Sequence, residues 1–160
     1  MPIYMQYEGI KGDVTTPGYI GWIELISAQM GTNRHITNPT GRGANREASV
    51  PSVSEIVVTK TQDSASTGLF RASLWGEGKK VKIVFTRKEK NVETSYMEIE
   101  LEGTLIASYN VSGHGGEGHD KPMESLSLNF TKIAYKVTGA SDAKDTKPQR
   151  AQWDLAPTGG

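Results

Sequence analysis

The stretch KKVKIVFTRKEKNVETSYMEIELEGTLIASYNV, residues 79–111, holds two runs of alternating residues that decide the fold class. Apolar side chains occupy every second position in both runs, as Val81, Ile83 and Phe85 in the first and as Met97, Ile99 and Leu101 in the second. A period of two is typical of β-strands that bury one face. Polar residues separate the runs around Lys90 and Asn91, so the stretch is predicted to be a β-hairpin that turns there.

The polar face of this hairpin carries opposite charges on its two arms. Pairing about the turn places Lys80 and Lys82 opposite an acidic series, Glu98, Glu100 and Glu102, and cross-strand pairs of opposite charge are mildly favourable. We therefore expect no nucleic-acid partner at the basic cluster, which consists of Lys79, Lys80, Lys82, Arg87, Lys88 and Lys90. The whole chain, with 18 basic and 18 acidic residues, also lacks the net charge that attracts nucleic acid or an anionic membrane.

Short strand patterns recur along the rest of the chain. Alternation or β-branched density predicts strands within 3–10, 22–30, 52–61, 125–137 and 151–157. The apolar phase slips once in the second of these, which predicts a bulge or a strand covered on both faces. It changes again near the middle of 125–137, which predicts a bulge or a strand that hands its apolar face from one neighbour to another.

One helix is predicted, over DSASTGLFRASLWG, residues 63–76. Asp63 or Ser64 can cap its first turn, and Gly76 can take the left-handed conformation that ends it. Its apolar face is predicted to consist of Leu69, Phe70 and Leu74. Many short strands around one short helix indicate an all-β fold, a β-barrel of two packed sheets or a sandwich.

Length and composition agree with one domain over residues 1–160. The absence of cysteine excludes disulfides, thiolate metal sites and cysteine nucleophiles. No window approaches 18 consecutive apolar residues, and the N-terminus lacks a basic region followed by an apolar run. We therefore expect neither a membrane span nor a signal peptide.

Residues 32–50, TNRHITNPTGRGANREASV, are predicted to be a long extended loop, because they hold few large apolar side chains. Loops of this length within compact domains are usually functional or disordered. Its GRGANRE segment resembles a phosphate-binding loop only superficially, since it lacks the lysine and hydroxyl residues of that motif.

The stretch SGHGGEGHDKPME, residues 112–124, contains the chain's other candidate site, His114, Glu117 and His119. Imidazole and carboxylate suit zinc, but this spacing matches no helical zinc motif and the glycines give no fixed geometry. The simpler interpretation is a glycine-rich connection with solvated histidines, and His35 is interpreted in the same way. We expect no catalytic residues, no metal and no cofactor, so the chain is not predicted to be an enzyme.

Taken together, these segments resemble the Hcp family, the hemolysin-coregulated proteins of bacterial type VI secretion systems. The matching segments, which span Ile3 to Leu155, are the opening strand with GIKGD, then GWIELIS ending at MG, VSEIVVTKTQDSASTGLF, LEGTLIASYNVSGHGGEGHDKPMESLSLNFTKIAYKV and the late WDL. The resemblance implies a β-barrel of two sheets flanked by a helix, assembled as a six-membered ring with a wide channel.

The resemblance also implies partners and a location. Stacked rings would form a tube that a contractile sheath propels behind a spike trimer, with effector proteins inside the channel. The subunit would assemble in the bacterial cytoplasm and be secreted by this system without a cleavable signal peptide.

Two groups of residues follow from the resemblance. In the family, the long loop after the second strand reaches along a neighbouring subunit or ring, and the residues given this role here are Arg34, His35, Asn38, Pro39, Arg42, Asn45 and Arg46. A channel wall should be polar because it touches water and cargo. Ser27 and Gln29, at alternate positions of the matching strand, are the candidates for that wall.

Two rival functions remain open at this point. A monomeric β-sandwich module could bind a carbohydrate or small ligand through exposed aromatic side chains such as Trp22, Trp75 and Trp153. A metal hydrolase would need the two histidines and the glutamate of residues 112–124 to converge.

Overall fold

The computed structural model describes residues 1–37, 47–48, 51–116, 118, 121–138 and 149–155. Its one helix is α1 (Ser66–Leu74). The strands are β1 (Ile3–Tyr7), β2 (Ile23–Leu25), β3 (Ser27–Gln29), β4 (Thr32–Asn33), β5 (Ile36–Thr37), β6 (Glu47–Ala48), β7 (Ser52–Val53), β8 (Ile56–Thr61), β9 (Lys79–Glu89), β10 (Val92–Ser112), β11 (Met123–Asn129), β12 (Lys132–Val137) and β13 (Gln149–Asp154). No helix in the described part has the length and apolar character needed to cross a membrane.

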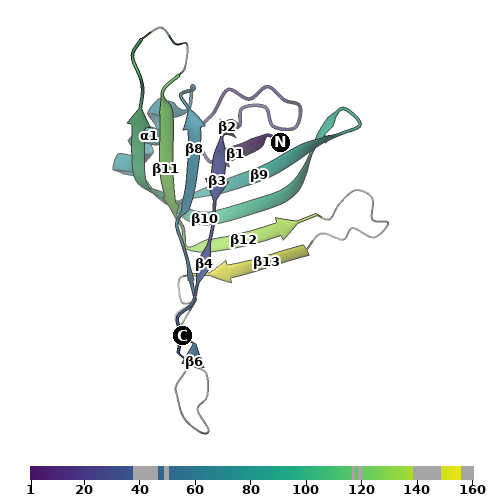
Figure 1. The fold of residues 1–160 in the computed structure, drawn as a ribbon, viewed down its shortest axis with the longest axis vertical. Coiled ribbons are helices and arrows are strands. Elements are labelled where there is room, and N and C mark those ends of the chain that lie inside the picture. Colours follow the sequence, from purple (N-terminus) through teal and green to yellow (C-terminus); the bar gives the residue numbers. More distant parts are fainter. Residues whose placement is uncertain (38–46, 49–50, 117, 119–120, 139–148, 156–160) are drawn as a thin grey trace.

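Most strands belong to two sheets that share β10. The first sheet has the order β2-β1-β9-β10-β12-β13, and the second sheet has the order β10-β11-β8-β3. Their strands cross in Figure 1, with the second sheet running towards the top of the view and the first sheet running across it. The predicted all-β class with two packed sheets is confirmed. Among the described strands, however, the two ends of the hydrogen-bonded path do not pair, so the barrel is not closed.

The long strand β10 changes sheets at Gly103. Residues 92–104 of β10 pair with β9, and residues 105–112 pair with β11. Gly103 has a φ of 63°, a conformation that glycine adopts far more readily than residues with a Cβ. A Cβ at this position would press against the Thr131 side chain, which lies between β11 and β12. The bend in β10 therefore depends on a residue without a side chain.

Both predicted phase slips mark places where the chain passes between the sheets. β2 pairs with β1 in the first sheet, and β3, which follows after Ile26, pairs with β8 in the second sheet. Likewise β11 lies in the second sheet and β12 in the first, with Phe130 and Thr131 between them. At each slip the other set of alternate residues begins to face the core, because the chain there enters the other sheet and pairs with a different strand.

The core fills the space between the sheets. Its buried members are Met5, Tyr7, Ile23, Leu25, Ile56, Val58, Ala65, Leu69, Val81, Ile83, Ile99, Leu101, Ile106, Leu126, Leu128, Phe130 and Ile133. Nearly all are the alternating apolar residues of the sequence patterns, so the period of two reports the buried faces correctly.

The predicted hairpin is β9 and β10. Val81, Ile83 and Phe85 pair with Leu101, Ile99 and Met97. Lys90 and Asn91 both have positive φ, as the two central residues of a tight hairpin turn require. The predicted charge pairing is confirmed for Lys82, whose Nζ lies 3.8 Å from a Glu98 carboxylate oxygen and 3.7 Å from a Glu100 oxygen.

The helix is shorter than predicted and buries a different face. It begins after Ala65, which makes no side-chain capping bond, so the prediction that Asp63 or Ser64 is the N-cap was wrong. Trp75 ends the helix in an extended conformation rather than Gly76 in a left-handed one. Leu69 is buried, but Phe70 and Leu74 are exposed. Ser66 is also buried, and Ala72 packs against the core.

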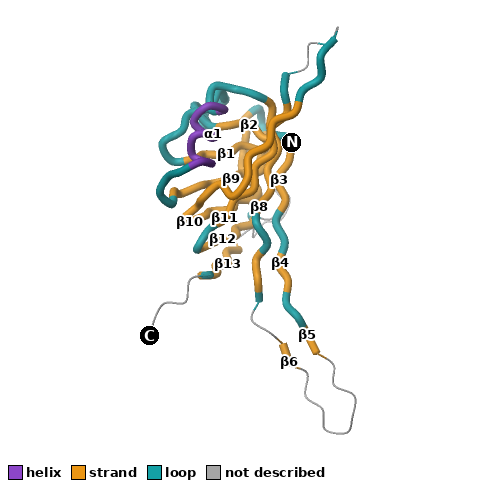
Figure 2. Tube along the Cα trace, turned by 90° about the vertical axis from the view of Figure 1, so that its left-hand side faces the viewer, coloured by secondary structure: helices purple, strands orange, loops and turns teal. Residues whose placement is uncertain are grey.

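The predicted loop over residues 32–50 is partly a β-ribbon. β4 pairs with β7 through Thr32 and Val53, and β5 pairs with β6 through Ile36 and Ala48. We call the paired strands β4–β7 the arm. It projects away from the sheets in Figures 1 and 2. Strand pairing there satisfies the hydrogen bonds of the backbone without burying many side chains. The apolar content of the sequence therefore did not predict this ribbon.

Candidate assembly surfaces and a buried polar network

The outward face of the second sheet carries no ionisable side chain among its described residues. Register places three rows across the strands: Asn110, Ser125, Thr59 and Ser27; then Ser108, Ser127, Val57 and Gln29; then Ser112, Met123 and Thr61, with Leu105 and Asn129 at the end of the sheet. We call these residues the uncharged face. Since 22% of the chain is charged, composition alone does not explain a sheet face without charge.

The outward face of the first sheet has the opposite character. One row contains Gln6, Lys82, Glu100, Ala134 and Gln152. Nearby rows add Glu24, Glu98, Glu102, Lys132, Lys136, Arg150 and Asp154. Arg150 and Glu100 approach to 3.9 Å across this face. The molecule therefore has one uncharged and one densely charged sheet face.

The two predicted channel residues both lie on the uncharged face. The Ser27 and Thr59 hydroxyl oxygens are 2.5 Å apart and hydrogen-bonded, so Ser27 is tied to β8. Gln29 is exposed at the end of β3. The structure thus brings these residues together with hydroxyl and amide groups of three further strands, which the sequence analysis did not single out.

The residues predicted to act in stacking are only partly described. Arg34 and His35 are exposed and lie between β4 and β5 of the arm. The others lie outside the described residues: Asn38, Pro39, Arg42, Asn45 and Arg46.

The histidine-rich connection gives no metal site in the described part of the chain. His114 is exposed, whereas Glu117 and His119 lie outside the described residues. The described residues contain no group of three side chains, of the kinds that bind metals, placed to hold an ion.

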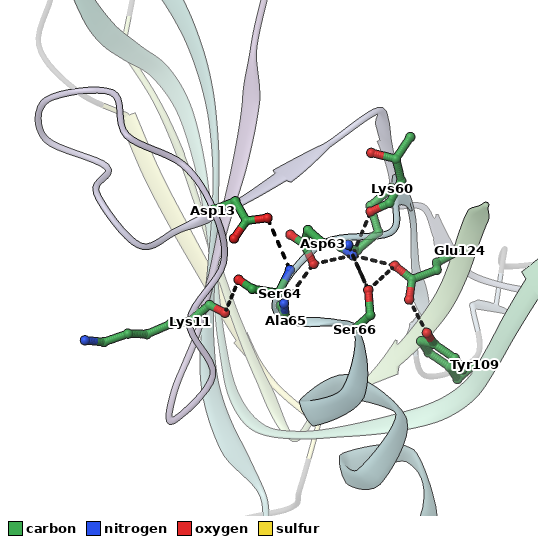
Figure 3. A network of polar contacts seen from close by, with 10 residues as sticks. Lys11, Asp13, Lys60, Asp63, Ser64, Ala65, Ser66, Tyr109 and Glu124 are labelled. Atoms are coloured by element: carbon green, nitrogen blue, oxygen red, sulfur yellow. Dashed lines mark hydrogen bonds and ion pairs between the residues drawn. The ribbon is translucent and has the colours of Figure 1, made fainter. Parts of the chain in front are cut away.

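A buried polar network joins α1 to β8 and β11 (Figure 3). The sequence analysis did not predict it. Lys60 on β8 and Glu124 on β11 are both buried, and the Lys60 Nζ lies 2.5 Å from Glu124 Oε2. The same ammonium group donates to Asp63 Oδ1 at 2.8 Å. Ser66, the first residue of α1, donates its hydroxyl to Glu124 Oε2 at 3.0 Å.

Tyr109 on β10 completes this network. Its hydroxyl donates to Glu124 Oε1, so both carboxylate oxygens of Glu124 are satisfied. Burial, followed by this hydrogen bond, raises the pKa of the Tyr109 phenol above its ordinary value of 10.0. Because the folded-state pKa is raised, this contribution to stability is present below pH 10 and is lost as the pH rises above it.

The geometry of the network is that of a structural connection. Lys60 and Glu124 are closed off from solvent, and their polar atoms bond to one another, so no substrate can reach them. The alternating patterns of β8 and β11 already contained a signal for the buried pair of Lys60 and Glu124. Ile56, Val58 and Lys60 share one face of β8, as Glu124, Leu126 and Leu128 share one face of β11. Extending the apolar phase by one position places both charges in the core.

The family model described as "Type VI secretion system effector, Hcp" matches residues 4–137. The chain belongs to the Hcp family. It is therefore a tube or effector protein of a type VI secretion system, and the Hcp family consists of structural secretion-system proteins.

Solved structures of Hcp proteins share the fold. A structure titled "Structure of a type six secretion system protein" superposes with a TM-score of 0.85 at 19% identity, covering 96% of this chain and 95% of that one. Hcp1 of Salmonella typhimurium gives a TM-score of 0.74 at 19% identity, with 96% and 94% covered. A mutant form of Hcp1 from the E. coli EAEC 042 pathovar gives a TM-score of 0.72 at 21% identity, with 98% and 99% covered. No curated protein matches the chain significantly by sequence.

Proposed function

We propose that this Hcp protein is the subunit of a secretion tube, assembling as six-membered rings that stack and carry effector proteins in their channel. The observation that carries the proposal is the family match over residues 4–137. Its partners would be further copies of itself, a spike trimer at the tip, the surrounding sheath and small effectors. It would assemble in the bacterial cytoplasm and leave the cell with the tube.

The uncharged face is the proposed channel wall. A channel that carries different proteins must release them, and hydroxyl and amide groups bond to water as readily as to cargo. A strongly charged wall would instead hold proteins of opposite charge and repel those of like charge. The placement of Ser27 and Gln29 on this face supports the assignment.

Replacing Gln29 with arginine should reduce cargo loading. Six copies of Gln29→Arg would add a ring of positive charge to the proposed wall, while the exposed position leaves the fold intact. Co-purification of an effector with assembled rings measures the effect. Gln6→Arg is the matched control, because Gln6 is an exposed glutamine on the charged face. Equal loading of wild type and Gln29→Arg would contradict the channel assignment.

The arm is the proposed stacking element. It projects from one end of the molecule, and the described part of the glycine-rich connection between β10 and β11 lies at the opposite end (Figure 1). An element at one end that meets the next subunit's other end makes a heterologous contact, which propagates as a stack.

Deleting residues 38–45 should leave the subunit folded and able to form rings but weaken stacking. The deletion begins after β5 and keeps every described residue of the buried core. Sedimentation and electron microscopy would compare the lengths of wild-type and shortened-arm filaments. Filaments of unchanged length and abundance would contradict the stacking role.

The first test of the proposal is the native mass of the purified protein, with negative-stain imaging of the same fraction. We expect a ring with a mass near six times the chain's 17.4 kDa. A monomer that persists at all concentrations would instead favour the ligand-binding module, for which Trp75 and Trp153 are exposed.

A further inference from the structure

An apolar groove of about 400 Å³ lies between the base of the arm and the first sheet. Its walls are β4 and β7, which form a separate two-stranded sheet, and β12 and β13 of the first sheet. None of the described residues that line it carries a charge. We call it the arm groove, and its apolar and aromatic lining includes Met30, Val53, Tyr135, Ala151 and Trp153.

The arm groove continues the core side of the first sheet into solvent. One row of this side runs from the buried Ile99 through Tyr135 to Ala151. Trp153 lies in the next row on the same side, and its side chain is 44% exposed. Apolar groups left open in this way lose contact with water when another chain covers them. The groove therefore favours an uncharged, apolar occupant.

The loop between β1 and β2 presents an apolar side chain of matching character. Ile20 is 74% exposed. Gly18 and Gly21 on either side have φ of 91° and 82°, and a Cβ built at either would have no atom within 4 Å. Ile20 therefore stands clear of its surroundings. We call residues 14–22, VTTPGYIGW, the Ile20 turn, and none of them is charged.

The Ile20 turn is held in one conformation. The Tyr19 backbone N–H donates to the Thr16 carbonyl at 2.9 Å, and that of Trp22 donates to the Tyr19 carbonyl at 3.0 Å. The Tyr19 ring stacks on Tyr4 of β1 at 5.0 Å between centroids, and Trp22 meets the Tyr19 ring edge-on. A preorganised turn loses little conformational entropy when it binds.

We propose that the Ile20 turn of one copy inserts into the arm groove of the copy in the next ring. This inference rests on the proposed function and adds a docking site to the stack. Both surfaces lack charge, although 22% of the chain is charged. The other exposed apolar side chain considered is Val92, at the tip of the β9–β10 hairpin. Lys88, Glu89, Lys90 and Glu93 surround it in sequence, and burying them in an uncharged groove would be costly.

The positions of the two surfaces exclude a contact within one copy. In Figures 1 and 2 the loop between β1 and β2 lies in the upper part of the molecule, and the arm leaves it at the lower end. A contact between different ends of two copies is heterologous and propagates as a stack. The groove lies beside the base of the arm, so both can engage the same neighbouring ring.

Introduced thiols report this contact directly, because the chain contains no cysteine. In a double variant, Ile20→Cys with Ala151→Cys, a short bismaleimide reagent should join copies of successive rings into a ladder of covalent multimers on a denaturing gel. Each single variant should give at most a dimer, because it has one thiol per copy. Val92→Cys with Ala151→Cys is the matched control, since Val92 is 63% exposed. No ladder from the Ile20 pair, or an equal ladder from the control, would overturn the proposal.

Charged substitutions test whether the contact supports stacking. Ile20→Asp and Ala151→Asp each place a carboxylate in the proposed contact, at exposed positions that should leave the fold and the ring mass unchanged. Filament length should fall several-fold in both, because the charge would be buried without a partner. Val92→Asp should keep wild-type filaments. Sedimentation and electron microscopy measure filament length, and circular dichroism checks the fold of all three.

The outcomes separate this inference from the proposed function. Normal rings and filaments of wild-type length in both Asp variants would overturn the inference and leave the proposed function intact. If Ala151→Asp keeps its filaments but loses effector co-purification, the groove binds a different partner and the inference is wrong. Wild-type rings that do not stack at any concentration would overturn the proposed stacking and this inference together.

Discussion

Lys60→Met should lower the free energy of unfolding by about 3–5 kcal/mol, because it leaves the buried carboxylate of Glu124 without its counter-charge. Lys60 is fully buried and bonds to the carboxylates of both Glu124 and Asp63. Methionine fills similar space but cannot donate. In a chain of this size the loss corresponds to a fall in melting temperature of about 10 °C.

Lys82→Met is the matched control for this prediction. Lys82 also approaches two carboxylates, those of Glu98 and Glu100, but its side chain is 37% exposed. Surface pairs of this kind contribute about 0–1 kcal/mol. Urea unfolding of both variants at one fixed protein concentration measures the difference, since assembly would add its own stabilisation. Equal losses in the two variants would contradict the importance of burial.

A double variant isolates the cost of the stranded Glu124 charge. Adding Glu124→Gln to Lys60→Met removes the stranded charge, while the amide oxygen can still accept from Ser66 or Tyr109. The double variant should therefore be more stable than Lys60→Met alone. A further loss would indicate that the Glu124 carboxylate stabilises the fold through its hydrogen bonds from Ser66 and Tyr109 by more than its stranded charge costs.

Gly103→Ala should lower the free energy of unfolding by about 2–4 kcal/mol, combining backbone strain with overpacking. The φ of 63° at Gly103 disfavours alanine, and the added Cβ would come within 3.1 Å of the Thr131 methyl carbon and closer still to its hydroxyl. Neither group can move freely, because Thr131 donates to the Glu102 carbonyl at 3.1 Å. The effect should be large because Gly103 is where β10 passes between the sheets.

Two further variants make this prediction specific. Gly115→Ala is the control, because nothing lies within 4 Å of the added Cβ there, and it should change stability little. Gly103→Ala should do less harm in a Thr131→Ala background, since the collision is then removed and only the backbone strain remains. Chemical unfolding of the four proteins measures both effects. Identical losses in the two backgrounds would show that the Thr131 contact is irrelevant.

The local features of this fold were readable from the sequence. Alternation in 79–111 predicted the hairpin, its turn at Lys90 and Asn91 and the face it buries, and the structure confirms all three. Alternation is a property of successive residues in one strand, so it can be recognised without knowing which strands pair with that strand. The two phase slips also located the crossings, although the sequence did not say that the chain changes sheets there.

Long-range partners could not be read in the same way. α1 was expected to bury Phe70 and Leu74, but both are exposed. The helix residues that are buried or packed against the core are Ser66, Leu69 and Ala72, because the position of the sheets decides which side of the helix is covered. The ribbon pairing of the arm was missed because backbone hydrogen bonds leave little trace in side-chain composition.

The sequence by itself determined the strand-rich class, the hairpin and the resemblance to the Hcp family. Each of these depends on which residue types follow one another along the chain. Only the tertiary structure paired Lys60 with Glu124 and joined side chains of four strands into the uncharged face. The alternation within one strand shows which of its residues face away from the core. Which other residues lie beside them is decided by strand order and register, through contacts between segments far apart in the chain.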